Sequence, residues 1–298
     1  MTLFDDMMEK ARKADGFLAA LDQSGGSTPK ALTAYGVPED KYVKGEESMY
    51  EMVHEMRTRM ITTPSFSGEK IIGAILFENT MDREIEGLPT GQFLWEKKGI
   101  VPFIKCDKGL ADEADGVQVM KPMPQLDELL KKSKSKDMFG TKMRSVIKKA
   151  NKGGITKVVD QQFEVGQQIL DAGLCPILEP EVDITSPEKE AIEEILKEEL
   201  IKGLDALKPC CNVMIKLSLP TKVNLYKEII DHPRCVCLVA LSGGYPREEA
   251  NDILSKQEGM IASFSRAILE GLQYGQTAEE FDTTMGATVD SIYQASRT

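Results

Sequence analysis

The stretch CNVMIKLS, residues 211–218, is the segment from which the fold can be worked out. It is apolar and lies between Pro209 and Pro220, a pattern typical of a short buried strand and not of a helix. Lys216 is its only cation. A buried lysine is rare unless it is paired, and an amine that loses its charge is a nucleophile able to form a Schiff base with a carbonyl. The alternative is a lysine whose ammonium reaches water or a carboxylate at the strand edge.

Seven other short apolar stretches resemble this strand, and helical patterns separate each from the next. Eight strands that alternate with helices predict an α/β fold, a closed (β/α)8 TIM barrel, since an open doubly wound sheet usually has fewer strands. Helical stripes before the first strand and after the last predict additional N- and C-terminal helices. No linker rich in Pro, Gly or Ser divides the chain, which predicts a single domain over residues 1–298. The expected strands are residues 16–22, 71–78, 100–107, 143–149, 175–182, 211–218, 235–242 and 259–266.

Composition and charge limit the classes of function. The chain is 41% hydrophobic and 29% charged, as soluble globular proteins are. Its net charge of -11 argues against a general binder of nucleic acid or of an anionic membrane. No apolar run approaches the length of a membrane span, and the N-terminal residues lack the pattern of a signal peptide. We therefore expect a cytoplasmic protein with a small-molecule partner, bound by local cations if that molecule is anionic.

Cysteine and histidine are arranged unlike the ligands of a metal site. Of the six cysteines, two are adjacent and two more share one apolar strand, which is typical of small core residues in a reducing cytoplasm and not of a disulfide framework. There is no CxxC pair, and His54 and His232 are the only histidines. A zinc site built on histidine and a Ser-His-Asp triad therefore find little support. The sequence predicts neither a metal nor a cofactor.

Polar residues follow the expected strands at the points where the strands end. In a (β/α)8 barrel the active site lies at that end. Neighbouring cations lower the pKa of a lysine, so a ring of lysines would favour a neutral Lys216 and would attract an anionic substrate. The alternative for each residue is a structural ion pair. Lys142 and Arg144 lie near the start of the fourth strand, so that strand is expected to begin earlier. The ring is expected to contain Asp22, Lys105, Lys142, Glu179, Lys216 and Arg266.

A turn of small residues follows the seventh strand. Ser242, Gly243 and Gly244 can present backbone N–H groups to a phosphate, and Arg266, one strand later, can bind it bidentately. On its own, the sequence SGG is equally consistent with a turn that ends the strand. Together with the arginine it predicts a phosphate site, which barrels often place after the seventh and eighth strands.

Eight segments of the chain resemble the class I fructose-bisphosphate aldolases, the lysine-dependent and metal-independent kind. They occur in the family's order and at compatible spacing, over about Leu18 to Leu272. The length of the chain resembles the compact bacterial or protist branch. The segments are LAALDQSGGSTPK (18–30), ILFENT (75–80), IKCDKG (104–109), TKMR (141–144), ILEPE (177–181), MIKLSLP (214–220), LSGGYPREEA (241–250) and SFSRAI (263–268).

The resemblance implies an aldehyde-lyase of glycolysis and gluconeogenesis. Lys216 would form a Schiff base with the ketone of fructose 1,6-bisphosphate, and the products would be dihydroxyacetone phosphate and glyceraldehyde 3-phosphate. Glu179, assisted by Lys142, would act as acid and base while the carbinolamine loses water. Asp22 would act at the hydroxyl that loses its proton as the carbon–carbon bond breaks. The residues implied in substrate binding are Lys105, Arg144, Glu181, Ser242, Gly243, Gly244, Arg266, Ser27 and Lys30, with Glu181 also supporting the lysine cluster.

Some positions depart from the longer animal and plant members of the family. Gln23 replaces an acidic residue, Ala31 replaces an arginine that helps to bind the distal phosphate, and Met143 replaces an aromatic residue. Those members also carry a tail with a functional tyrosine, a role that we do not assign to Tyr293 because it lies on a helical stripe. Members of the family often associate, so a homo-oligomer is expected.

Three alternatives remain open from the sequence. The change at Ala31 leaves a monophosphate or a seven-carbon bisphosphate as a possible substrate. A sugar-phosphate-binding barrel without turnover is the alternative of another class. A metal-dependent aldolase would have few ligands in a chain with two histidines.

Overall fold

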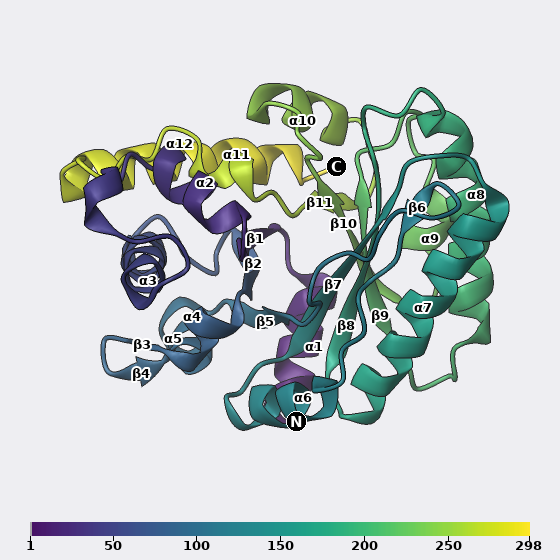
Figure 1. The fold of residues 1–298 in the computed structure, drawn as a ribbon, viewed down its shortest axis with the longest axis horizontal. Coiled ribbons are helices and arrows are strands. Elements are labelled where there is room, and N and C mark those ends of the chain that lie inside the picture. Colours follow the sequence, from purple (N-terminus) through teal and green to yellow (C-terminus); the bar gives the residue numbers. More distant parts are fainter. Residues whose placement is uncertain (1) are drawn as a thin grey trace.

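Eight parallel strands lie side by side in the computed structural model, which describes residues 2–298 (Figure 1). Their order in the sheet is their order in the chain, and every pairing between successive barrel strands is parallel. The expected (β/α)8 fold is confirmed. The strands are β1 (Phe17–Leu21), β2 (Ile71–Leu76), β5 (Val101–Lys105), β7 (Gly140–Ile147), β8 (Cys175–Val182), β9 (Val213–Ser218), β10 (Cys235–Leu241) and β11 (Met260–Ala262).

The barrel is nearly closed where β1 meets β11. Ala20 in β1 donates its backbone N–H to the carbonyl of Phe264, just beyond β11, at 3.3 Å. A closed sheet leaves no free edge, and its strands bring their C-terminal ends to one mouth. Residues that follow β1 and β11 are therefore neighbours although they are far apart in the sequence.

Helices cover the outside of the barrel, and short elements fill the connections. The helices are α1 (Leu3–Lys13), α2 (Ser27–Ala34), α3 (Glu47–Thr62), α4 (Glu78–Asp82), α5 (Thr90–Lys98), α6 (Leu126–Ser135), α7 (Lys152–Asp171), α8 (Lys189–Ala206), α9 (Lys227–Ile230), α10 (Arg247–Leu254), α11 (Arg266–Leu269) and α12 (Ala278–Ala295). The short elements are the 3-10 turn Glu39–Lys41, β3 (Glu84–Ile85), β4 (Leu88–Pro89) and β6 (Val117–Gln118). Figure 1 shows α7 and α8 together on one side and α2, α3 and α12 on the other.

The expected N- and C-terminal helices are confirmed as α1 and α12, and α1 has a definite place in the core. The barrel interior is filled by inward-facing apolar residues such as Leu18, Ile75 and Phe103. Met7 and Ala11 of α1, 1% and 3% exposed, belong to the same cluster. Helix α1 therefore covers the N-terminal end of the barrel, and the opposite end is left to polar side chains.

The fourth strand, drawn over residues 143–149, begins at Gly140 and ends at Ile147, so the expectation that it begins earlier is confirmed and its drawn end is wrong. Strand β7 begins at Gly140, which pairs with Phe103 on one side and Cys175 on the other. Basic side chains hide this start in the sequence, because they break the apolar run while they point into the mouth of the barrel. Lys142 is therefore the third residue of β7, as its expected place in the ring required.

One further boundary differs from that expected. The eighth strand, expected over residues 259–266, ends at Ala262, and α11 begins at Arg266. After β1, α2 begins at Ser27. The hydroxyl of Ser27 donates to the carbonyl of Ser24 at 2.8 Å and so stabilises the first turn of this helix.

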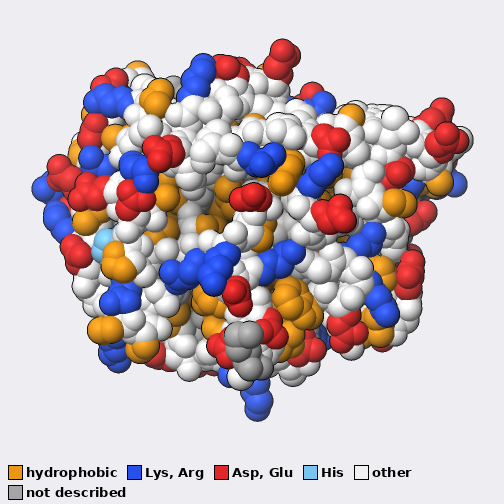
Figure 2. Space-filling model, turned by 180° about the vertical axis from the view of Figure 1, so that it is seen from behind, with side chains coloured by type: hydrophobic (Ala, Val, Ile, Leu, Met, Phe, Trp, Pro, Cys, Tyr) orange, Lys and Arg blue, Asp and Glu red, His pale blue; other side chains and the backbone are white. Residues whose placement is uncertain are grey.

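The molecular surface mixes charges of both signs. On the face opposite to that of Figure 1, acidic and basic side chains lie next to one another (Figure 2). Ion pairs at such exposed positions contribute little to stability and keep the surface hydrated. Across residues 2–298, none of the helices is both long enough and apolar enough to cross a membrane.

Candidate active site

Inward-facing positions change from apolar to charged along the barrel strands. Side chains of a strand alternate between the two faces of the sheet, so every second residue points inward. In β8, buried Ile177 is followed at the next inward position by Glu179, and in β9, Met214 is followed by Lys216. The same change brings Asp22 after Ala20, which ends the apolar interior along β1. The mouth therefore collects charged groups above an apolar floor.

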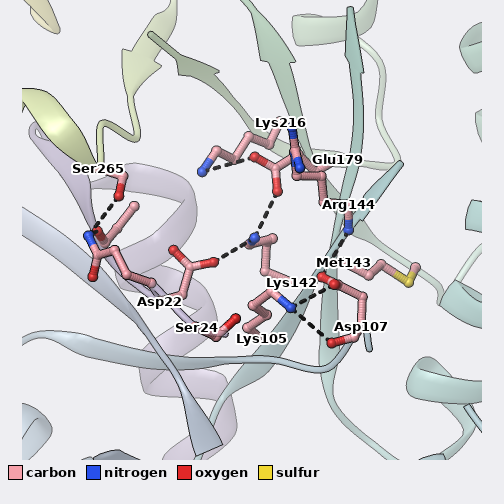
Figure 3. A network of polar contacts seen from close by, with 12 residues as sticks. Asp22, Ser24, Lys105, Asp107, Lys142, Met143, Arg144, Glu179, Lys216 and Ser265 are labelled. Carbon is pink, nitrogen blue, oxygen red and sulfur yellow. Dashed lines mark hydrogen bonds and ion pairs between the residues drawn. The ribbon is translucent and has the colours of Figure 1, made fainter. Parts of the chain in front are cut away.

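Four charged side chains form one chain of contacts across this mouth (Figure 3). Lys216 Nζ lies 3.2 Å from Glu179 Oε1. Lys142 Nζ lies 2.9 Å from Glu179 Oε2 and 2.6 Å from Asp22 Oδ2. Two strands separate β1 from β7 in the sheet, so the Lys142–Asp22 pair spans the interior of the barrel. The four residues that the sequence assigned to catalysis are thus in contact, with side chains that are at most 11% exposed.

Burial and charge act in opposite directions on these groups. Burial alone would raise the pKa of Asp22, but neighbouring lysines, above all Lys142, lower that pKa to about 2. Burial alone would lower the pKa of Lys142, but the carboxylates of Asp22 and Glu179 raise it above its ordinary value. At neutral pH, Asp22 is therefore ionised and Lys142 is protonated.

One oxygen of Glu179 has no hydrogen-bond donor. Oε2 is buried, and no group in residues 2–298 donates to it with hydrogen-bond geometry, although the ammonium of Lys142 is close. A buried acceptor without a donor is unfavourable and calls for an explanation, which a catalytic role can supply. Beside its ion pair with Lys142, Oε2 can still accept a hydrogen bond from a group that enters the site.

Lys105 belongs to a second cluster, which is centred on Asp107. Lys105 Nζ lies 2.6 Å from Asp107 Oδ1 and 2.9 Å from the Asp107 carbonyl oxygen. The same carboxylate accepts the backbone N–H of Gly109 at 3.1 Å and that of Arg144 at 3.2 Å. Asp107 therefore joins β5, the loop after it and β7. The sequence analysis did not include Asp107 in the site, although a carboxylate two residues after Lys105 was a usable signal.

Arg144 and Glu181 form an ion pair at the rim, between β7 and β8. Burial would lower the pKa of Arg144, but Glu181 raises it. Glu181 was expected to support the lysine cluster, and its direct partner is this arginine. The side chain of Arg144 is 38% exposed, so its guanidinium is accessible to a ligand at the mouth.

The small-residue turn after β10 lies beside Arg266. Gly243 and Gly244 have φ values of 62° and 129°, which residues with a side chain rarely adopt. A Cβ atom on Gly243 would lie 2.6 Å from Ile184 Cγ2. A Cβ atom on Gly244 would lie 3.2 Å from Arg266 Nη2, which places the guanidinium next to the turn. The turn, begun by the buried Ser242, and the arginine are thus brought together as the sequence predicted.

Two candidates lie apart from the central chain of contacts. Ser27 and Lys30 are exposed on α2. Glu78, which also ends an expected strand, pairs with Lys108 and Lys132 at 3.2 Å each. Glu78 therefore belongs to an ion-pair network around α4 and α6, outside the mouth.

A buried cation escaped the sequence analysis. Arg57 of α3 is 1% exposed, and it donates to Thr80 Oγ1 and to the carbonyl oxygen of Gln23, both at 2.6 Å. It lies on the buried face of a methionine-rich helix, and no motif marks it. The structure places it directly behind the loop that carries Asp22.

Thiol chemistry does not compete with the lysine. All six cysteines are free, and Cys106 is the one that directly follows β5, between Lys105 and Asp107. Burial raises the pKa of Cys106 to about 12, so its thiol stays protonated and is a poor nucleophile at neutral pH.

Residues 7–212 match the family model described as fructose-bisphosphate aldolase class-I. The chain belongs to the class I fructose-bisphosphate aldolases. A fructose-bisphosphate aldolase class 1 from Porphyromonas gingivalis is 57% identical to this aldolase over 291 residues, which are 98% of each chain. Because class I is metal-independent, this aldolase is a metal-independent lyase.

Solved structures support the fold of this aldolase. The fructose-bisphosphate aldolase of Plasmodium falciparum, solved in complex with TRAP and a small-molecule inhibitor, superposes with a TM-score of 0.80 at 20% identity, over 99% of this chain and 94% of that one. A Schiff-base-forming fructose-1,6-bisphosphate aldolase, described through its reaction intermediates, gives a TM-score of 0.55 at 10% identity, over 98% and 100% of the two chains. At these identities the likeness concerns the barrel fold.

Proposed function

We propose that this aldolase cleaves fructose 1,6-bisphosphate reversibly to dihydroxyacetone phosphate and glyceraldehyde 3-phosphate, with Lys216 as the nucleophile. The observation that carries the assignment is the chain of contacts from Lys216 through Glu179 and Lys142 to Asp22. Covalent catalysis by an amine needs an acid–base group within hydrogen-bond reach, and Glu179 lies 3.2 Å away.

In the first step, the amine of Lys216 attacks the ketone carbon and a carbon–nitrogen bond forms. Glu179 takes up the proton that the nitrogen loses and passes it to the carbonyl oxygen, which becomes the hydroxyl of a carbinolamine. After it has taken up a second proton from the solvent, Glu179 donates that proton to the hydroxyl, which leaves as water while the protonated imine forms. Oε2 of Glu179 suits this exchange because it is paired with Lys142 but receives no well-oriented hydrogen bond, so it can accept and return a proton.

In the second step, Asp22 accepts the proton of the C4 hydroxyl. The electrons of the C3–C4 bond move to the protonated imine, which becomes an enamine, and the aldehyde product is released. The low pKa of Asp22 keeps it ionised, and hence able to accept a hydrogen bond from that hydroxyl. Lys142, between the two carboxylates, holds them apart from one another and oriented toward the substrate.

Trapping with borohydride tests the nucleophile. Incubation of the enzyme with substrate and borohydride should add the mass of one sugar phosphate to the peptide that contains Lys216, because reduction makes the imine permanent. Lys216→Arg keeps the charge but cannot form the imine, so it should give neither label nor turnover. Lys216→Ala should also be inactive, and a wild-type protein that shows no more turnover than Lys216→Ala would favour a barrel that only binds sugar phosphate. A label on another lysine would contradict the assignment.

The two phosphates would lie on opposite sides of the mouth. The turn of Ser242, Gly243 and Gly244, together with Arg266, supplies N–H groups and a guanidinium for one of them. Ala31 is 8% exposed and packs inward from α2, so this position contributes nothing to the other phosphate. We assign the distal phosphate to Arg144 and Lys30. Lys105 and Ser27 complete the proposed set of binding residues.

Comparison of two substrates tests the distal site. Arg144→Ala and Lys30→Ala should each raise the KM for fructose 1,6-bisphosphate by roughly tenfold, since a hydrogen bond to a charged group contributes about 1.5–3 kcal/mol. The KM for fructose 1-phosphate should change little. Lys148→Ala is the control, because Lys148 forms an exposed pair with Glu113 just beyond β7. Equal changes for both substrates would contradict the assignment.

A cytoplasmic location is part of this proposal. Cys210 is exposed and free, and such a thiol persists most readily in a reducing compartment. Fractionation of cells with an antibody to the protein would check it. A homo-oligomer stays a prediction, to be measured by light scattering.

A further inference from the structure

The side chain of Gln23, directly after Asp22, has a fixed orientation. Its Oε1 lies 3.2 Å from Arg57 Nη2, and its Nε2 lies 3.3 Å from the carbonyl oxygen of Ala20. A guanidinium can only donate and a backbone carbonyl can only accept. Both neighbours therefore require the amide oxygen to face Arg57 and the amide NH2 to face away from it.

Arg57 is itself held in place. Its Nη1 donates to Thr80 Oγ1 and its Nη2 to the carbonyl oxygen of Gln23, both at 2.6 Å. Burial lowers the pKa of Arg57 to about 10, which leaves the guanidinium charged at neutral pH. It therefore remains a donor under the conditions in which the enzyme works.

The amide NH2 of Gln23, which faces away from Arg57, donates a hydrogen bond to Ser265. Gln23 Nε2 donates to Ser265 Oγ at 2.7 Å. Within residues 2–298, Ser265 Oγ has no other hydrogen-bond partner, so its own proton is available. Ser265 precedes Arg266, and Figure 3 shows Ser265 and Asp22 on the side of the site toward which the amine of Lys216 extends.

We propose that Arg57, Gln23 and Ser265 form a relay of donors in which each hydrogen bond runs toward the mouth of the barrel. The relay makes the Ser265 hydroxyl a donor to the substrate phosphate that is bound beside Arg266. This inference rests on the phosphate site of the proposed function. Ser265 contacts the phosphate, whereas Arg57 and Gln23 act as positioning residues.

A glutamate at position 23 would reverse the relay. Both of its side-chain oxygens can only accept, so Ser265 would donate its proton to the carboxylate and turn a lone pair toward the phosphate. A methionine at that position would break the relay without adding charge. Glu, Met and Gln differ little in size, so the three proteins compare hydrogen-bond polarity more than volume.

The test is competitive inhibition by inorganic phosphate in wild type, Gln23→Glu, Gln23→Met, Ser265→Ala and the double variant Gln23→Glu with Ser265→Ala. The relay predicts that Ser265→Ala and Gln23→Glu each raise the inhibition constant by roughly fivefold to tenfold, with a smaller rise for Gln23→Met. The inhibition constant of the double variant should equal that of Ser265→Ala alone, because the direction of the hydrogen bond at position 23 no longer matters once the serine hydroxyl is absent. Fold-changes that multiply in the double variant would mean that the new charge acts directly, which would overturn the relay.

Arg266→Ala separates a failure of the relay from a failure of the phosphate site. If this variant binds phosphate as wild type does, the phosphate lies elsewhere, and both the site and the relay are wrong. If it binds phosphate more weakly while Gln23→Glu does not, only the relay is wrong. Far-UV circular dichroism would establish that each variant is folded. Arg57→Lys, which keeps the charge with fewer fixed donors, should raise the inhibition constant less than Arg57→Met does.

Discussion

Lys142 holds two carboxylates at once, and this shared contact organises the candidate site. It lies 2.6 Å from Asp22 and 2.9 Å from Glu179, and its side chain is 4% exposed. A buried charge is tolerated when it is paired, and here one ammonium neutralises parts of two acids. The same contact lowers the pKa of Asp22 in the folded enzyme below its ordinary value. The stability of the enzyme therefore depends on pH.

We expect Asp22 to stabilise the folded enzyme at neutral pH and to lose this effect in acid. Its pKa falls from 3.8 to about 2 on folding. Above about pH 5 it is ionised in both states and the contribution is complete. From about pH 5 down to pH 2 the unfolded chain takes up a proton first, so the contribution declines. The shift corresponds to about 2 kcal/mol.

Urea unfolding of wild type and Asp22→Asn would measure this effect. The difference between their free energies of unfolding should be constant from pH 7 to about pH 5 and should narrow below that, down to the lowest pH at which both proteins fold. A difference that is the same at every pH would show that the ion pair does not stabilise the fold.

At the scale of elements, β7 has to lie close to β8 to bring Lys142 to Glu179. Gly140 begins β7, and a Cβ atom there would lie 2.1 Å from the carbonyl oxygen of Cys175. Gly140→Ala should therefore push the strands apart, destabilise the protein by roughly 1–3 kcal/mol and lower kcat by roughly tenfold to a hundredfold, since small displacements of catalytic groups are costly. Thermal unfolding and steady-state kinetics would measure the two effects.

Gly153→Ala is the matched control for this prediction. Gly153 is exposed near the start of α7, and the nearest atom to a Cβ there is Asn151 Oδ1, at 3.5 Å. Alanine favours a helix over glycine by up to about 1 kcal/mol, so this variant should be as stable as wild type or more stable. If both variants behaved alike, the close approach of β7 and β8 would not be the cause.

Strands and helices differ from single residues in how well the sequence predicts them. The eight barrel strands could be predicted because each is an apolar run with a polar residue at its end, and Lys216 stands out within such a run. Arg57 could not be predicted, since its partners lie 34 residues before it and 23 after it and only folding brings them together. Strand β6 has two residues, too few for an alternating pattern, and it pairs antiparallel with β7. The apolar run alone misplaces the start of β7, because its inward positions are basic.

The whole molecule is expected to unfold as one unit. The interior of the barrel is continuous with α1, and Trp95, the only tryptophan, packs against the same cluster from α5. A shared core predicts a single cooperative transition. In urea, tryptophan fluorescence and far-UV circular dichroism should therefore change at the same midpoint. Two separate midpoints would contradict the prediction of a single domain.

The ion pairs among Lys216, Glu179, Lys142 and Asp22 also determine which part of the mouth attracts anions. Two lysines face two carboxylates, so the formal charges of these four groups sum to zero. A proton that moves from a lysine to a carboxylate does not change this sum. The centre of the mouth is thus electroneutral, and a doubly phosphorylated sugar is drawn by the cations around it. In the proposed mechanism, bond cleavage and the attraction of the substrate therefore belong to different groups at the mouth, so substitutions among the surrounding cations would change the preferred ligand and leave the four central groups as they are.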